Sequence, residues 1–355
     1  MEQPGLKGVT ILETKISEID GGKGTLSYRG IAVDEIVENY TFEQTAFFLL
    51  FGTFPSKSEL ENFEKKLIHY RVMPDYMVRI LSELPREQPM MDVLRTMVSA
   101  MTLKTSDTTE QSIQLIAILP TIIAYRYRYI NDLPFIEPNK ELGHVANFMY
   151  MLKDNDNSNY AKILETYLII TMEHGLNAST FSARVTVSTE SDLISAITSA
   201  IGTMKGPLHG GAPSGVIQLL ESIKTEEQIS ETIHKKLENG ERIMGFGHRV
   251  YKTMDPRAEA LKNTINQLDN TPNWMSLALQ TEIETINILK KLKPNHQLYT
   301  NVEYYAAAIM KTIEIDESLF TAIFSSSRIV GWCAHVLEQS NNNTIYRPNA
   351  KYVGN

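Results

Sequence analysis

The chain of 355 residues has only one cysteine, Cys333. A single thiol excludes an intrachain disulfide framework and a metal site built from cysteines, and it favours a reducing compartment. A surplus of basic residues is also missing, because the formal net charge is −8 at pH 7. Without a broad basic stripe, nucleic acid is not the expected partner.

Long apolar segments are absent as well. The most apolar run, Ile113 to Ala124, contains Pro120 and is too short to span a bilayer. The N-terminal residues 1–24 are mixed and charged, without the apolar core of a signal peptide. We therefore expect no membrane association and a cytoplasmic location. With 43% hydrophobic and 21% charged residues, the composition is typical of a soluble globular protein, and the length suggests two domains.

Most of the chain has patterns of helices. Apolar residues recur at steps of three and four from Tyr160 to Met172, which predicts an amphipathic helix. Residue pairs typical of capping boxes precede several other apolar stripes. These pairs are Thr41 with Gln44, Ser56 with Glu59, Thr189 with Asp192, and Thr225 with Gln228. Gly52 and Gly240 are expected to end the first and last of these helices.

Strand patterns are weak and confined to residues 8–16 and 24–29. The predicted fold is therefore all-α, with a minor β contribution at the N-terminus. The segment Gly206–Gly211 interrupts two helical regions, since proline and several glycines cannot continue a helix. We predict a bend there that acts as a hinge and allows closure over a ligand.

Two histidines are framed by glycines. His209 lies in Gly-Pro-Leu-His-Gly-Gly, and His248 lies in Gly-Phe-Gly-His-Arg-Val-Tyr, followed by Asp-Pro-Arg257. A ring presented on such bare backbone can donate a hydrogen bond or move a proton near neutral pH. The Gly-x-Gly before His248 lacks the third glycine of a dinucleotide fingerprint, so a Rossmann site is not expected.

Further polar groups stand beside structure-breaking residues. His174 follows the 160–172 stripe, and Glu303 lies in Asn-Val-Glu-Tyr-Tyr. Taken alone, His174 is as compatible with a structural residue at a helix C-terminus as with a functional one. Glu303 taken alone is compatible with an ordinary acidic residue at a helix N-terminus. Arg257, Arg328 and Arg347 are each compatible with a solvated surface position. The histidines have no short His-x₃-His pair, so no metal is expected.

Together these groups suit one class of substrate. Several arginines can hold carboxylates through bidentate hydrogen bonds, and histidines can bind carbonyl oxygens where negative charge develops. A carboxylate can remove a proton from carbon. The combination predicts condensation of a di-acid with an acyl group.

The same segments identify a family. The chain resembles citrate synthases over nearly its full length, and the short bacterial and archaeal enzymes in particular, which include 2-methylcitrate synthases. The most specific segments are Gly206–Gly211 and Gly245–Arg257, in this order and spacing. Others are Gly5–Val9, Leu26–Gly30, Glu173–Arg184, Ser327–Trp332 and Arg347–Gly354.

The resemblance implies an almost all-α homodimer with two domains per subunit. Residues 1–207 and 313–355 would form a large domain on the dimerisation and oxaloacetate side. Residues 208–312 would form a small domain on the CoA side, which closes on the substrates. The implied substrates are oxaloacetate and then acetyl-CoA, with no cofactor and no metal.

Roles of single residues also follow from the resemblance. His209 would stabilise the enolate of acetyl-CoA, Glu303 would remove the methyl proton, and His248 would polarise the oxaloacetate carbonyl. His174, Arg257 and Arg328 would bind oxaloacetate, and Arg347 would reach the partner's site. Backbone groups of Ile243, Met244, Gly245, Phe246 and Gly247 would meet the adenine end of CoA, with Arg249 and Lys252 as phosphate contacts.

One position departs from the family pattern. Most members have aspartate where this chain has Glu303, so the base gains a methylene, and residues 304–308 differ too. A displacement of about 1 Å can cost on the order of 100-fold in rate. We therefore expect a slow citrate synthase or one that prefers another acyl-CoA. The alternatives are a 2-methylcitrate synthase that uses propionyl-CoA, and a weakly active paralogue that binds metabolites.

Overall fold

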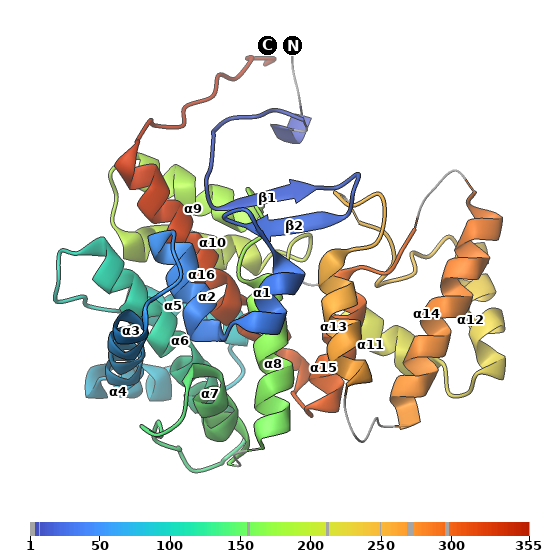
Figure 1. Cartoon of the computed structure of the whole chain (residues 1–355), viewed down its shortest axis with the longest axis horizontal. Coiled ribbons are helices and arrows are strands. Elements are labelled where there is room, and N and C mark those ends of the chain that lie inside the picture. The colour runs from blue at the N-terminus through green and yellow to red at the C-terminus, as the bar shows by residue number, and fades with distance from the viewer. Residues whose placement is uncertain are drawn as a thin grey trace.

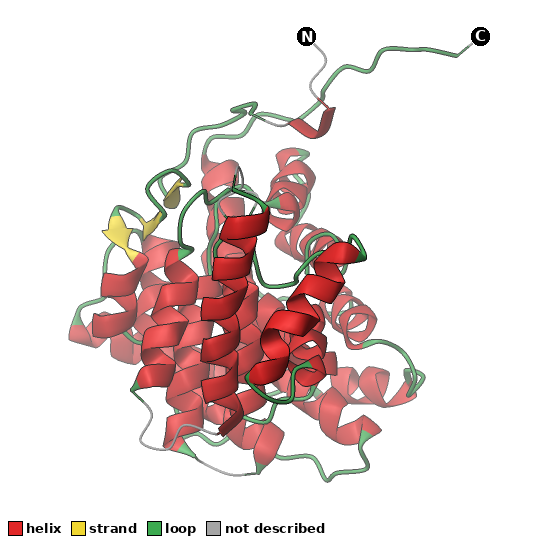
Figure 2. Cartoon of the chain, turned by 90° about the vertical axis from the view of Figure 1, so that its right-hand side faces the viewer, coloured by secondary structure: helices red, strands yellow, loops and turns green. Residues whose placement is uncertain are grey.

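A buried helix, α16 (Phe320–Asn341), runs through the centre of the larger group of helices (Figure 1). The computed structural model describes residues 4–6, 8–154, 157–210, 213–248, 250–267, 273–294 and 298–354. In these ranges helices dominate, and one small sheet lies near the N-terminus (Figure 2), which confirms the all-α prediction.

The remaining helices of the larger group precede the His209 bend. They are α1 (Val33–Asn39), α2 (Phe42–Phe51), α3 (Lys57–Tyr70), α4 (Asp75–Glu83), α5 (Met90–Ser99), α6 (Thr108–Ile130), α7 (His144–Lys153), α8 (Ser158–Thr171), α9 (Ala178–Ser188) and α10 (Leu193–Met204). The helices after the bend are α11 (Pro213–Ser222), α12 (Glu227–Glu238), α13 (Pro256–Asn266), α14 (Asn273–Leu292) and α15 (Val302–Thr312), and the short 3₁₀ helices are η1 (Pro4–Leu6) and η2 (Glu317–Leu319).

Local capping signals set several helix ends. Thr41 and Ser56 form the predicted capping boxes, and Gly52 ends α2 in the left-handed conformation with φ +90°. The predicted pair of Thr189 with Asp192 is wrong as a box. Asp192 itself caps α10 by accepting from the Ser195 amide, and Thr189 is the C-terminal cap of α9, where its hydroxyl donates to the Thr186 carbonyl.

The Thr225–Gln228 pair also forms no capping box. Helix α12 begins after Glu226, which makes no side-chain cap, and Gln228 instead accepts from the Lys224 amide. Gly240 does follow the end of α12 as predicted, with φ +74°.

The sheet is an antiparallel meander of β1 (Ser17–Asp20), β2 (Thr25–Tyr28) and β3 (Ile31–Ala32). The predicted strand at 24–29 is confirmed by β2. The predicted strand at 8–16 is wrong, because the pairing register joins Ser17–Asp20 to β2 and leaves residues 8–16 outside the sheet. The turn between β1 and β2 therefore consists of residues 21–24.

Helix α16 owes its central place to its composition. Its buried residues lie on all sides of the helix, as expected for one enclosed by other helices. Helices α9, α6, α10 and α8 pack around it. The single cysteine, Cys333, lies on α16 and is fully buried, and burial raises the pKa of its thiol to about 12.

The helices after the bend form a second group on the right of Figure 1. A separate apolar cluster joins α11, α12 and α14 through Leu219, Ile223, Ile229, Ile233, Ile243 and Ile288. Helices α13 and α15 instead pack against α8 and share the main core. The predicted domain boundary at 208 and 312 stays a prediction.

The described ranges contain neither a membrane-spanning helix nor a metal-binding cluster. No described helix has the length and hydropathy needed to cross a membrane. No group of three or more described His, Cys, Asp or Glu side chains is arranged to hold a metal ion.

Candidate active site

His209 stands on the predicted bend at the end of α10. Its amide and that of Gly210 donate to the Gly206 carbonyl at 2.9 and 3.1 Å, which closes a tight turn. A Cβ on Gly210 would lie 2.3 Å from the Met204 carbonyl oxygen, so only glycine fits there. The Thr321 hydroxyl donates to the Gly210 carbonyl at 2.9 Å and ties the turn to the first turn of α16.

The hydrogen bonds of His209 assign its tautomer. Its Nε2 accepts from the Ser179 amide at 3.3 Å and lies 2.7 Å from the Ser179 hydroxyl, which itself accepts from Trp332 Nε1 at 3.0 Å. The ring proton is therefore on Nδ1. Burial, and secondly Arg328, lowers the pKa of His209 to about 4, so the ring is a neutral donor at neutral pH.

His248 is oriented by backbone groups. Its Nδ1 accepts from the amides of Val250 and Tyr251 at 3.0 and 3.1 Å, which leaves the proton on Nε2. Burial and the nearby Arg257 lower its pKa to about 4. The flanking Gly245 and Gly247 have φ of +86° and +83°, which explains why glycines frame this histidine.

His174 meets His248 across the site. It follows α8. Its ring centroid lies 5.7 Å from that of His248, and the angle between the two ring planes is 86°. Its Nε2 is 3.0 Å from the Tyr251 hydroxyl. Burial, with Arg257 and Arg328, holds its pKa well below the ordinary value. All three histidines of the site are therefore neutral.

Arg257 is fixed by a buried carboxylate. Asp255 accepts from Arg257 Nε at 3.0 Å and from Nη2 at 2.8 Å, and both residues are buried. Asp255 also accepts from the Val302 amide at 3.1 Å, so it joins Arg257 to the start of α15. Arg257 Nη2 is 3.4 Å from His248 Nε2, which places two donors side by side where an anionic oxygen could accept from both.

Arg328 supplies a second buried cation from α16. Its Nε donates to the Thr171 carbonyl at 2.7 Å, and its guanidinium lies over the Phe324 ring. No described residue accepts a hydrogen bond from its two terminal nitrogens, so both are available to a ligand. Burial lowers its pKa, yet guanidinium stays charged at any physiological pH.

Glu303 stands in the first turn of α15. Asn301 caps this helix by accepting from the Glu303 amide at 3.0 Å, and its side-chain nitrogen donates to the Gly247 carbonyl at 2.8 Å. Burial raises the pKa of Glu303 to about 7, against the opposing effect of Arg257, while Asp255 adds to the rise and Arg328 opposes it. A carboxyl group with this pKa is suited to remove a proton near neutral pH.

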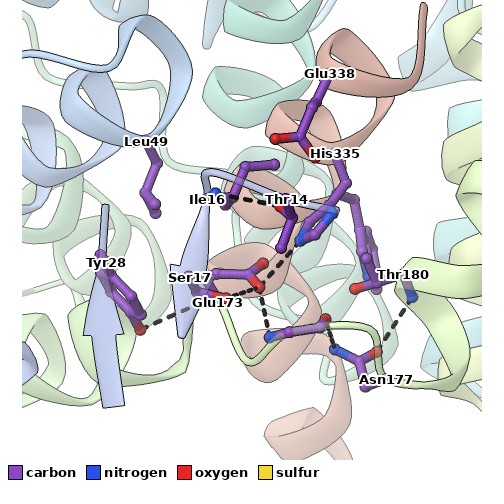
Figure 3. A network of polar contacts seen from close by, with 12 residues as sticks. Thr14, Ile16, Ser17, Tyr28, Leu49, Glu173, Asn177, Thr180, His335 and Glu338 are labelled. Carbon is purple, nitrogen blue, oxygen red and sulfur yellow. Dashed lines mark hydrogen bonds and ion pairs between the residues drawn. The ribbon is translucent and has the colours of Figure 1, made fainter. Parts of the chain in front are cut away.

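A buried polar network surrounds Glu173, the residue directly before His174 (Figure 3). One oxygen of Glu173 accepts from the Ser17 hydroxyl at 2.8 Å, the Gly175 amide at 2.5 Å and His335 Nε2 at 3.0 Å. Burial alone would raise the pKa of Glu173, but the His335 ring, the charge of Arg328 and the Ser17 hydroxyl lower it. The network fixes the turn that carries His174.

Only some of the predicted CoA residues share one pocket. Ile243, Phe246, Gly247 and His248 line a pocket of about 830 Å³, together with Leu237, Arg242, Leu289, Leu292, Lys293, Pro294 and Leu298. Met244 and Gly245 belong to the same segment but do not line that pocket. Lys252 is exposed at the surface, and Arg249 lies outside the described residues.

Arg347 is not brought to this site. It is exposed on the extended segment 342–354, which leaves the body of the chain (Figures 1 and 2). Its predicted place in a partner's site stays a prediction.

Four supporting residues were not singled out from the sequence. Tyr251 and Asp255 lie inside the glycine-framed segment, and Asn301 directly precedes Val302-Glu303, so adjacency was a usable signal for all three. Ser179 gave no such signal, because its contact with His209 joins residues 30 positions apart.

The chain is similar to known citrate synthases in sequence and in fold. The family described as "Citrate synthase, C-terminal domain" matches residues 5–349. The Bacillus subtilis citrate/2-methylcitrate synthase is 38% identical over 361 residues, which cover 99% of this chain and 96% of that protein.

Solved structures give the same result. Citrate synthase from Thermotoga maritima superposes with a TM-score of 0.90 at 41% identity, covering 100% of this chain and 96% of that one. The ternary complex of carboxymethyl coenzyme A and oxaloacetate with citrate synthase from Thermoplasma acidophilum has a TM-score of 0.91 at 29% identity, covering 99% and 96%. The chain therefore belongs to the citrate synthase family of acyltransferases.

Proposed function

We propose that this protein condenses acetyl-CoA with oxaloacetate and water to give citrate and CoA. The observation that carries the proposal is the convergence of one carboxyl group of raised pKa with neutral histidine donors and two buried arginines. The relative from Thermoplasma acidophilum binds oxaloacetate together with a CoA analogue, which supports the same pair of ligands here.

Oxaloacetate is assigned to the space between His174, His248 and the two arginines. Arg257 and Arg328 bind its carboxylates, because guanidinium groups match carboxylate geometry and both are held in place by the protein. His248 donates from Nε2 to the ketone oxygen, so the carbonyl carbon becomes more electrophilic.

Acetyl-CoA is activated by a base and a donor together. Glu303 takes a proton from the methyl carbon while His209 Nδ1–H donates to the thioester oxygen, which forms an enolate. A positioned base supplies roughly 10²–10⁴-fold, and one donor to the developing oxyanion supplies roughly 10²–10³-fold. Both are needed because a thioester C–H is a very weak acid.

Carbon–carbon bond formation completes the first half of the reaction. The enolate carbon attacks the oxaloacetate carbonyl carbon, and the resulting alkoxide takes the Nε2 proton of His248, which is restored by the proton that Glu303 removed from the methyl group. Water then hydrolyses the thioester of citryl-CoA, and CoA leaves as the thiol. The scheme uses protein groups alone and requires no metal or prosthetic group.

The remaining assignments concern CoA and assembly. The pocket beside residues 243–248 is lined by Arg242 and Lys293, whose charges suit CoA phosphates. Movement of residues 208–312 as a small domain would exclude water from the intermediate. We also propose a homodimer in which Arg347 reaches the partner's site, and the cytoplasm as its location.

A second candidate is 2-methylcitrate synthesis from propionyl-CoA. The name of the Bacillus subtilis relative includes both activities. The two acyl groups differ by one methylene, which is worth only about 1–3 kcal/mol in discrimination.

One assay tests the proposal. Release of free thiol is measured with oxaloacetate and either acetyl-CoA or propionyl-CoA. The expected result is turnover with acetyl-CoA at the higher kcat/KM. A higher kcat/KM with propionyl-CoA makes the protein a 2-methylcitrate synthase, and turnover with neither favours a paralogue that only binds metabolites.

A further inference from the structure

The turn of the N-terminal hairpin, residues 21–24, packs against the segment 250–254. The turn is fixed internally, because the Gly24 amide donates to the Asp20 carbonyl at 2.8 Å. The Asp20 carboxylate also accepts from the amides of Gly22 and Lys23, at 3.0 and 2.9 Å. The hairpin therefore presents a turn of defined shape to its neighbour (Figure 1).

The contact between the two segments is made by backbone. The Lys252 amide donates to the Gly21 carbonyl at 2.8 Å. A Cβ on Gly21 would lie 2.3 Å from the Val250 carbonyl oxygen, and a Cβ on Gly24 would lie 2.7 Å from that of Met254. Neither carbonyl can move away as a flexible side chain would, so both positions require glycine.

Segment 250–254 directly supports the oxaloacetate side of the site. The amides of Val250 and Tyr251 hold His248 in its tautomer, and the Tyr251 hydroxyl contacts His174. The segment ends at Asp255, which fixes Arg257. A shift of this segment therefore moves His248, Tyr251 and Arg257 together.

The strands of the same hairpin hold His174 from the other side. The Ser17 hydroxyl donates to Glu173, and the Tyr28 hydroxyl accepts from the Glu173 amide at 3.3 Å (Figure 3). A Cβ on Gly175 would lie 3.1 Å from the end of the Ile19 side chain, so β1 also covers the turn after His174. One hairpin thus touches the supports of both histidines.

We propose that the N-terminal hairpin sets the distance between His174 and His248, with Gly21 and Gly24 as positioning residues for oxaloacetate. The hairpin contacts no reacting atom and acts only through segment 250–254 and the Glu173 turn. This inference rests on the proposed function, since it assigns the two histidines to oxaloacetate.

Two neighbouring glycines give a matched test. Gly21→Ala forces its Cβ against Val250, whereas a Cβ on Gly22 meets only the Asp20 carboxylate at 3.3 Å, and neither glycine has positive φ. We expect Gly21→Ala to lower kcat/KM for oxaloacetate on the order of 10- to 100-fold through KM. It should also weaken the thermal shift induced by oxaloacetate, while Gly22→Ala stays near wild type.

A second pair separates positioning from strain. Gly24 and Gly30 both have positive φ, +71° and +88°, but a Cβ on Gly30 meets nothing within 4 Å. Both alanine variants should lose stability, and only Gly24→Ala should lose affinity for oxaloacetate. If the glycine variants do not fold, the comparison of Ser17→Ala with Thr25→Ala decides, because the Thr25 hydroxyl lies on the same hairpin, is exposed, and bonds to no described residue.

The outcomes distinguish this inference from the proposed function. If the wild-type protein shows neither turnover nor an oxaloacetate-induced thermal shift, the proposed function is wrong. If the wild type is active and Gly21→Ala and Gly22→Ala have equal KM values for oxaloacetate, the positioning role of the hairpin is overturned. Equal KM values for Ser17→Ala and Thr25→Ala overturn it as well.

Discussion

The two walls of the site are built by different means. The helix wall carries His174, His209 and Arg328 beside α8, α9 and α16, where the hydroxyl and amide of Ser179 hold His209 and the Thr171 carbonyl accepts from Arg328. The loop wall, residues 243–257, holds His248 by the amides of Val250 and Tyr251, after two glycines of positive φ. We therefore expect activity to be most sensitive to the removal of a side chain in the helix wall. In the loop wall we expect it to be most sensitive to an atom added at a glycine.

The largest expected effect is on the helix wall. His209→Ala removes the Nδ1 donor, so kcat should fall about 100- to 1,000-fold. The affinity for oxaloacetate, measured by the thermal shift, should stay close to wild type, since His209 is assigned to the thioester. A variant that keeps wild-type kcat would take His209 out of the mechanism.

The next effect concerns the base between the two walls. Glu303→Asp withdraws the carboxylate by one methylene from the start of α15, where the charges of Arg257 and Arg328 act on it. We expect kcat with acetyl-CoA to fall on the order of 10- to 100-fold, because proton transfer depends steeply on distance. A rise in kcat would instead mean that the extra methylene is a defect, and that the surroundings of Glu303 still suit aspartate.

The pH dependence tests the same residue without moving it. Glu303 must lose its proton to act as a base, and its pKa is about 7. The kcat/KM for acetyl-CoA should therefore rise about tenfold per pH unit below 7 and level off above. His209 and His248, with pKa values of about 4, should add no step above pH 5.

The pH dependence of the free energy of unfolding tests this pKa independently. A carboxyl group whose pKa is raised on folding stabilises the folded state fully below its ordinary value of 4.5, and that contribution is lost as pH rises through about 7. The Glu303→Gln variant should lack this fall. A flat rate profile from pH 6 to 8 would contradict the assignment of Glu303 as the base.

The smallest effect is expected on the loop wall. Gly245→Ala and Gly240→Ala both place alanine at positive φ, which costs about 1–3 kcal/mol in the free energy of unfolding. A Cβ on Gly245 would also lie 2.8 Å from the Tyr304 ring, whereas one on Gly240 meets nothing. Only Gly245→Ala should raise the KM for acyl-CoA several-fold, and equal KM values would mean that the loop wall tolerates added atoms.

A local pattern predicts some helix starts and not others. The boxes at Thr41 and Ser56 form as their three-residue spacing predicts, but the same spacing at Thr189 and Thr225 gives no box, because those helices begin after Asp192 and Glu226 instead. The strand at 8–16 was wrong because pairing with β2 sets which residues form β1, and that register depends on the turn and the packed face.

Motifs and a family resemblance predict the site residues, whereas their contacts, tautomers and pKa values follow only from the structure. No pattern reveals that Tyr251 contacts His174 across 77 positions, or that the Ser179 amide fixes the His209 tautomer. The raised pKa of Glu303 likewise depends on burial and on charges from two other segments, Asp255–Arg257 and α16. Such properties arise only when distant segments are packed together.

The burial of Cys333 has a practical and a chemical consequence. A thiolate is the form that oxidants and alkylating reagents attack, and this thiol is both enclosed by α16's neighbours and held protonated by its pKa of about 12. Oxidants thus have no reactive cysteine to modify in the folded chain. A thiol-specific dye added to a turnover assay would report released CoA alone, without background from the protein.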